Sequence, residues 1–170
     1  MAWTPTYNTL NLRAIASNLM TYFNTNQDEA LKWANGGTPL KKFGELAVRV
    51  QDIDKPLFPA LQFSDDDDAV DYTEDECTGV YAVTFECLIQ NGDPATATLE
   101  ARKYAKAIVS MIREAPSSTI SANTGATTGS LTLRTVETGF SPIKKHRDIR
   151  SFLQEFQVKV TYSLFGLDKL

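Results

Sequence analysis

Apolar and polar residues alternate regularly between Gly79 and Asn91. Every second residue there is apolar, while the residues between are more polar; the apolar set is Tyr81, Val83, Phe85, Cys87 and Ile89. A period of two is typical of a β-strand with one apolar face and one mostly solvated face. The pattern therefore predicts a long strand that packs on the core by one side.

A helix is predicted directly after this strand. Asp93 suits an N-cap because its carboxylate can accept from free backbone N–H groups, and Pro94 suits the first helical position. The following apolar residues recur at helical spacing and form one stripe, made of Ala101, Tyr104, Ala105, Ile108 and Ile112. Pro116 predicts that the helix ends near Ala115.

The clearest strand pattern lies near the end of the chain, from Phe152 to Leu164. Large apolar residues alternate there with charged and polar ones. This regularity predicts a central position in the sheet. We expect Phe85, Val158 and Ile108 to be buried together between the sheet and the helices.

The remaining periodic segments complete the fold. Helices are predicted from Thr9 to Asn24 and, as a further turn or two, from Asp28 to Ala34, where Trp33 packs down on the core and Asn35-Gly36-Gly37 closes the segment. Further strands are predicted at Phe43–Gln51, Leu57–Phe63 and Leu131–Phe140, with Gly139 as the candidate bulge. The order helix, strand, strand, strand, helix, strand, strand predicts one α+β domain over residues 1–170. Its sheet is mostly antiparallel, with helices packed on one face.

Three connecting segments differ from the rest in composition. Residues 64–76 are strongly acidic and contain the run Asp65, Asp66, Asp67 and Asp68; residues 117–130 are almost all small and polar; residues 141–150 are basic and contain Lys144, Lys145, Arg147 and Arg150. Each is predicted to be an exposed loop. The acidic and basic segments are the candidate interface residues, because a head-to-tail contact uses different patches on each subunit. The acidic run is alternatively a surface that repels phosphate, or simply a solvated loop.

Composition limits the classes of function. The chain has 170 residues, a hydrophobic fraction of 42% and a net charge of −4, which supports one core and argues against a general nucleic-acid binder. No apolar run approaches the roughly 20 residues that a membrane helix needs. His146, the only histidine, lies among cations, and the two cysteines form no zinc set. We therefore expect no catalytic residue, no cofactor and no metal, and consecutive aspartates without a central glycine do not match an EF-hand.

Four stretches read together carry a family resemblance. An N-terminal helix covers Leu10–Leu19, the strand Gly79–Cys87 leads into the helix Glu100–Ile108, and the strand Phe156–Tyr162 lies near the end. This order resembles the tail terminator proteins of tailed bacteriophages, which cap the head-proximal end of the tail tube. The likeness is one of pattern over most of the chain, and no short motif in it is diagnostic.

The resemblance implies a structural virion protein made in the host cytoplasm. It implies a homohexameric ring that contacts the tail tube protein on one side and a neck or connector protein on the other, with DNA passing through the lumen and no membrane contact. Another phage neck or tail-completion protein is an alternative, as is a cytoplasmic α+β binding domain. An enzyme is disfavoured by the residue inventory.

Overall fold

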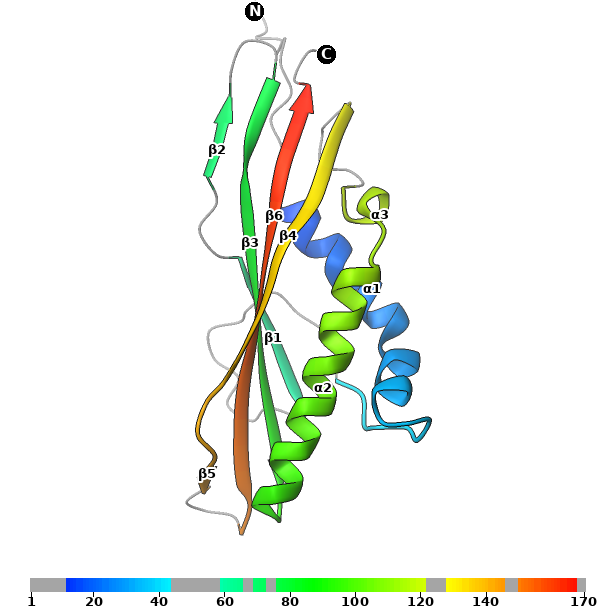
Figure 1. Ribbon diagram of the computed structural model, residues 1–170, viewed down its shortest axis with the longest axis vertical. Helices are drawn as coiled ribbons and strands as arrows, with labels where there is room; N and C mark the ends of the chain where they lie inside the picture. The colour runs from blue at the N-terminus through cyan, green and yellow to red at the C-terminus, as the bar shows by residue number, and fades with distance from the viewer. Residues whose placement is uncertain are drawn as a thin grey trace, which may run out of the picture.

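The computed structural model describes residues 12–43, 59–65, 69–72, 76–121, 128–145 and 150–167. The elements in order are α1 (Leu12–Ala34), β1 (Ala60–Asp65), β2 (Ala69–Tyr72), β3 (Glu76–Asn91), α2 (Pro94–Glu114), α3 (Ser117–Ser121), β4 (Thr128–Phe140), β5 (Lys144–Lys145) and β6 (Phe152–Leu167). The predicted α+β class with an antiparallel sheet is confirmed (Figure 1). Apart from Phe43, the strand predicted at Phe43–Gln51 lies outside the described residues.

The sheet is built around two strands of equal length. β3 and β6 have 16 residues each and pair antiparallel from Glu76↔Leu167 to Asn91↔Phe152. β1 and β2 pair with the other side of β3, and β4 and β5 pair with the other side of β6, all of them antiparallel. The order across the sheet is β1-β3-β6-β4, so the predicted central position of the last strand is confirmed.

The core lies between one face of the sheet and the helices α1 and α2 (Figure 1). Phe85, Val158 and Ile108 are each fully buried in this cluster, as predicted. Phe85 stacks on Phe23 of α1 at a centroid distance of 4.8 Å and meets the edge of the Phe63 ring at 5.0 Å. The period-two pattern in β3 and β6 thus places its apolar residues on the helix side.

A register shift in β4 falls between Leu133 and Thr135, and not at Gly139, where the sequence predicted a bulge. Gly139 pairs regularly with Gln157. The extra residue at Arg134 changes which residues face the helices. Leu133 faces that side before the shift and Val136 after it, because both pair with buried residues of β6. The shift therefore keeps apolar residues on the core in both halves of the strand.

α1 is one continuous helix, whereas the sequence predicted two helical segments with a break near residues 25–27. The polar side chains in the gap bond within the helix. Thr25 Oγ1 donates to the Thr21 carbonyl at 2.9 Å, and Asn26 Nδ2 donates to the Tyr22 carbonyl at 2.7 Å. The predicted closure is confirmed: Gly36 and Gly37 have φ of 66° and 92°, and the Gly37 N–H donates to the Lys32 carbonyl at 2.9 Å.

The predicted core position of Trp33 is wrong, because 54% of this residue is exposed. Because α1 is one continuous helix, its buried face includes Phe23, Leu31 and Ala34. Trp33 lies about 100° away from Ala34 around the helix axis, so it points off that face. Lys106 of α2 lies over its ring, with Nζ 4.1 Å from the ring centroid.

The loop predicted at residues 117–130 is wrong at both ends. Residues 117–121 form α3, and β4 begins at Thr128. Ile120 explains the order at the first end, since only 2% of it is exposed and its carbonyl accepts from Asn18 Nδ2 of α1 at 3.0 Å. One buried anchor is enough to hold this short turn against α1.

The acidic segment is also more regular than predicted. β1 extends to Asp65, β2 occupies residues 69–72, and β3 begins at Glu76. The basic segment likewise contains β5. Edge strands tolerate charged residues because one side of the strand faces solvent. Composition alone therefore predicted loops where short edge strands form.

The predicted N-cap of α2 is confirmed. Asp93 accepts from the Thr96 N–H at 2.7 Å and from Thr96 Oγ1 at 2.7 Å, and Pro94 begins the helix. These hydrogen bonds, the one from the Thr96 hydroxyl first, lower the pKa of the Asp93 carboxyl from its ordinary value of 3.8. The ionised cap is therefore bound more favourably in the folded state than in the unfolded state.

We expect Asp93→Ala to lower the midpoint of thermal unfolding at neutral pH, because two donors at the helix start lose their acceptor. A lowered folded-state pKa contributes stability above the unfolded pKa and loses it as pH falls through the folded value. The gap between wild type and Asp93→Ala should therefore narrow below pH 3.8. Asp93→Asn is the matched control, since it keeps an acceptor without the carboxyl titration. An equal gap at all pH values would contradict this assignment.

Candidate functional site

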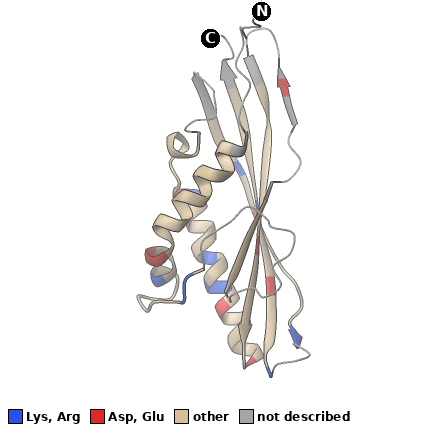
Figure 2. Cartoon of the chain, turned by 180° about the vertical axis from the view of Figure 1, so that it is seen from behind, with Lys and Arg blue, Asp and Glu red and all other residues tan. Residues whose placement is uncertain are grey.

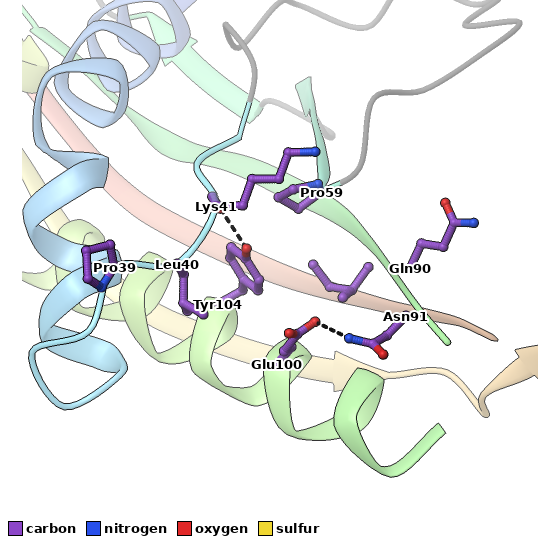
Figure 3. Close-up of a pocket in the computed structure, with 9 residues that line it drawn as sticks. Pro39, Leu40, Lys41, Pro59, Gln90, Asn91, Glu100 and Tyr104 are labelled. Atoms are coloured by element: carbon purple, nitrogen blue, oxygen red, sulfur yellow. Dashed lines mark hydrogen bonds between the residues drawn. The ribbon is translucent and has the colours of Figure 1, made fainter. Parts of the chain in front are cut away.

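A cavity of about 510 Å³ lies where the end of β3 meets α2 and the segment around Lys41 (Figure 3). The Tyr104 hydroxyl donates to the Lys41 carbonyl at 2.6 Å, and Asn91 Nδ2 donates to Glu100 Oε2 at 3.2 Å. Burial, with the Glu100 charge second, raises the pKa of the Tyr104 hydroxyl, so Tyr104 stays a neutral donor. These groups are occupied in orienting one another. The cavity could hold a small polar group, and none of its lining residues is a predicted site residue.

The described residues contain neither a metal cluster nor a helix suited to a membrane. Within those ranges, no three His, Cys, Asp or Glu side chains lie close enough to hold a metal ion. Among the helices that the structure describes, none is long and apolar enough to cross a membrane. Cys87 is a free, buried thiol, and burial raises its pKa. It is therefore a poor nucleophile.

The predicted acidic residues map to one edge of the sheet. Asp65 is the last residue of β1 and pairs with Val83. Asp66, Asp67 and Asp68 lie outside the described residues. Asp71 in β2 is exposed on the same edge. The acidic segment is thus attached to the edge formed by β1 and β2.

The predicted basic residues map to the opposite edge. Lys144 and Lys145 form β5 and pair with Leu153 and Phe152. Both lysines are exposed, and Lys144 Nζ lies 3.8 Å from Glu155 Oε2, a surface ion pair of small energetic weight. Arg150 is exposed, and Arg147 lies outside the described residues. The two charged segments are therefore separated by the full width of the sheet within one subunit.

The two strands also differ in position along the sheet: Figure 2 shows the acidic β2 in the upper part of the view and the basic β5 in the lower part. Asp65 pairs with Val83, which in turn pairs with Val160 of β6, whereas Lys144 pairs with Leu153 of β6. Val160 and Leu153 are seven residues apart along β6, which is about 23 Å of strand. Asp65 and Lys144 therefore do not lie together within a subunit.

The edge of β4 was not singled out by the sequence, although it is the longest edge of the sheet. It has 13 residues, and no described residue pairs with its outer side. Arg134 is exposed at its register shift. In the sequence, an arginine inside an alternating segment does not by itself indicate a contact surface. Only the pairing order, which makes β4 an edge, shows that this residue lies on a surface available to a partner.

A second surface that the sequence missed is a groove of about 330 Å³ between α1 and α2. Its lining includes Tyr22, Trp33, Met111 and two exposed carboxylates, Glu29 and Glu114. The exposed position of Trp33 could have been found by continuing the helical stripe of α1 through residues 25–27. The groove is thus lined by two aromatic side chains, Met111 and two carboxylates.

No protein-family model matches the chain, and no curated protein matches its sequence. A chain of similar shape occurs in a solved structure described as "Virion of native gene transfer agent (GTA) particle". The sequence identity is 14%, the TM-score is 0.34, and the match covers 91% of this chain and 95% of that chain. We base no functional argument on a likeness of this distance.

Proposed function

We propose that this protein is a structural component of a phage-type virion, specifically a tail terminator that forms a ring at the head-proximal end of a tail tube. Its partners would be further copies of itself, the tail tube protein and a neck or connector protein. The proposal assigns it no catalysis, cofactor or metal. Another neck or tail-completion role within the same class is the nearest alternative.

The observation that carries the proposal is the pair of opposite sheet edges, one with Asp65 at the end of β1 and the other with the exposed Arg134 in β4. A cyclic head-to-tail assembly needs two different complementary patches on one subunit. The order of helices and strands that resembles the tail terminator family supports the same interpretation. The likeness to the gene transfer agent chain is too distant to add to this support.

The arrangement of layers supports a ring with a polar interior. α1 and α2 cover one face of the sheet, whereas the other face carries polar side chains, including Lys159 and Gln157, whose Nε2 donates to Glu86 Oε1 at 3.3 Å. In a ring with helices outward, the face that carries Lys159 and Gln157 would line the lumen. Its mixture of both charges would hold DNA weakly, because strong retention needs several phosphates neutralised together.

Electron microscopy of the purified full chain at high protein concentration tests the proposal. We expect rings with a central hole, and we expect these rings to bind the ends of isolated tail tubes of the cognate phage. A protein that remains monomeric and does not bind tubes would overturn it. The cavity beside Tyr104 favours the competing class, a cytoplasmic binding domain, which would bind a small polar ligand as a monomer.

A further inference from the structure

We propose that neighbouring copies join by continuing the sheet, with the free edge of β4 pairing antiparallel with the β1–β2 edge of the next copy. This inference rests on the proposed ring and names the contact that closes it. The contact is made first by backbone hydrogen bonds and second by charged residues. The occupant of the β4 edge is therefore a second copy of this chain.

Strand direction makes this pairing favourable. Four strand positions cross the sheet, and each neighbouring pair is antiparallel. β4 therefore runs in the same direction as β3, and β1 and β2 run in the opposite direction. If copies are related only by rotation about an axis along the strands, β4 of one copy meets β1 and β2 of the next in antiparallel orientation. The alternation of the sheet then continues without interruption.

The two edges also match in height and length. β1 and β2 together lie opposite residues 77–88 of β3, which pair with residues 155–166 of β6. β4 lies opposite residues 156–167 of β6. The two edges thus cover the same stretch of the sheet to within one residue. Copies placed side by side would pair along nearly the whole of both edges.

The two edges are also interrupted at nearly the same position along the strands. Arg134 sits at the register shift, between Leu133 opposite Tyr162 and Thr135 opposite Thr161. On the other edge, β1 ends at Asp65, level with Val160, and β2 resumes at Ala69, level with Ser163. Side-by-side placement therefore brings Arg134 to the end of β1 in the next copy, where Asp65 begins the acidic run. Residues of opposite charge at neighbouring positions attract each other.

This assignment replaces the basic segment as the partner of the acidic residues. Lys144 and Lys145 pair with Leu153 and Phe152, which come seven and eight residues before Val160, the residue of β6 in line with Asp65. Pairing them with Asp65 would require a shift of about 23 Å between copies. Such a shift would leave much of each edge unpaired, whereas placing Arg134 beside Asp65 requires no shift between copies.

The hydrogen bonds at the end of β4 show which of its backbone groups are free. The Ser141 N–H donates to the Glu155 carbonyl at 3.0 Å, which makes Phe140↔Phe156 a non-hydrogen-bonded pair. By alternation, Val136, Thr138 and Phe140 direct their N–H and C=O groups away from β6. Thr135, Glu137 and Gly139 direct theirs toward it. The first set is available to a neighbouring strand.

Amide hydrogen exchange of the full chain, compared between monomer and ring, tests the inference at single residues. We expect the amides of Val136, Thr138 and Phe140 to exchange quickly in the monomer and to slow at least tenfold in the ring. The amides of Thr135, Glu137 and Gly139 should be slow in both states, because they already bond to β6. Rings in which the first three amides stay fast would overturn the inference and leave the proposed ring intact. Absence of rings, together with failure to bind tail tubes, would overturn both.

Two variants give an independent readout. Thr138→Pro should leave the monomer folded, since the lost N–H has no partner among the residues that the structure describes, but it should abolish ring formation because proline cannot donate across the edge. Arg134→Glu should weaken assembly at least tenfold, and Asp65→Lys in the same chain should restore it. Arg113→Glu on α2, an exposed basic residue away from both edges, is the matched control and should assemble as wild type. Rings of Thr138→Pro at wild-type concentration would contradict the edge contact.

Discussion

Phe85→Ala is expected to lower the free energy of unfolding by about 3–5 kcal/mol. Phe85 is fully buried in the middle of β3, with Phe23 stacked on its ring at 4.8 Å and Phe63 against it at 5.0 Å. Truncation removes both ring contacts and leaves a cavity between the sheet and α1. Neither neighbour can close it without leaving its own position, because both rings are themselves fully buried.

Chemical denaturation of the monomeric protein measures this effect. Leu99→Ala is the matched control, since 57% of Leu99 is exposed on α2, and surface changes of this kind stay within about 0.5 kcal/mol. A loss for Phe85→Ala as small as that of the control would show that this face of β3 is not the core face. Because β3 pairs with β6 along its whole length, such a result would also reverse the faces of β6.

The sequence predicted the elements whose side chains repeat regularly. Val83 and Phe85 in β3, and Val158 and Val160 in β6, alternate strictly, and all four are buried on the helix side. Period and face are properties of the local chain, so they can be read without a partner. The cap at Asp93 was also local, because its acceptor and donors lie within three residues.

The prediction failed where order depends on distant partners. α3 forms because Ile120 reaches α1, and β2 and β5 form because β3 and β6 extend far enough to pair with them. The register shift at Arg134 similarly reflects the pairing with β6 and not the glycine content of β4. Segments with few apolar residues become ordered when a long neighbour supplies the hydrogen bonds.

The candidate site shows the same limit more strongly. The sequence identified charged segments but not the edges that carry them, because an edge is defined by which strand has no further neighbour. The acidic and basic segments were predicted to be complementary patches on different subunits, and that stays a prediction; within one subunit, Asp65 and Lys144 lie opposite positions of β6 that are seven residues apart. Arg134 lies at nearly the same position along the strands as Asp65, and this position can be assigned only when the pairing of β4 is known.

The second large effect concerns Gln154, a buried polar residue in the otherwise apolar face of β6. Only 4% of Gln154 is exposed. Its Nε2 donates to the Ser141 carbonyl and to the Glu155 carbonyl, the latter at 3.1 Å, and its Oε1 accepts from Thr98 Oγ1 at 3.3 Å. One side chain thus joins α2, β6 and the segment after β4.

Gln154→Leu is expected to lower the free energy of unfolding by about 1–3 kcal/mol, although leucine is similar in size and more apolar. The substitution leaves the Ser141 carbonyl and the Thr98 hydroxyl without this partner, at a position where the side chain itself is only 4% exposed. Gln157→Leu is the matched control on the solvated face of the same strand, where Gln157 bonds to Glu86 and water can replace it. Denaturant unfolding should therefore separate the two variants by about 1 kcal/mol or more, a difference set by the burial of the lost hydrogen bonds. Equal losses in both variants would mean that Gln154 acts only by filling space, and that the end of β4 is held by strand pairing alone.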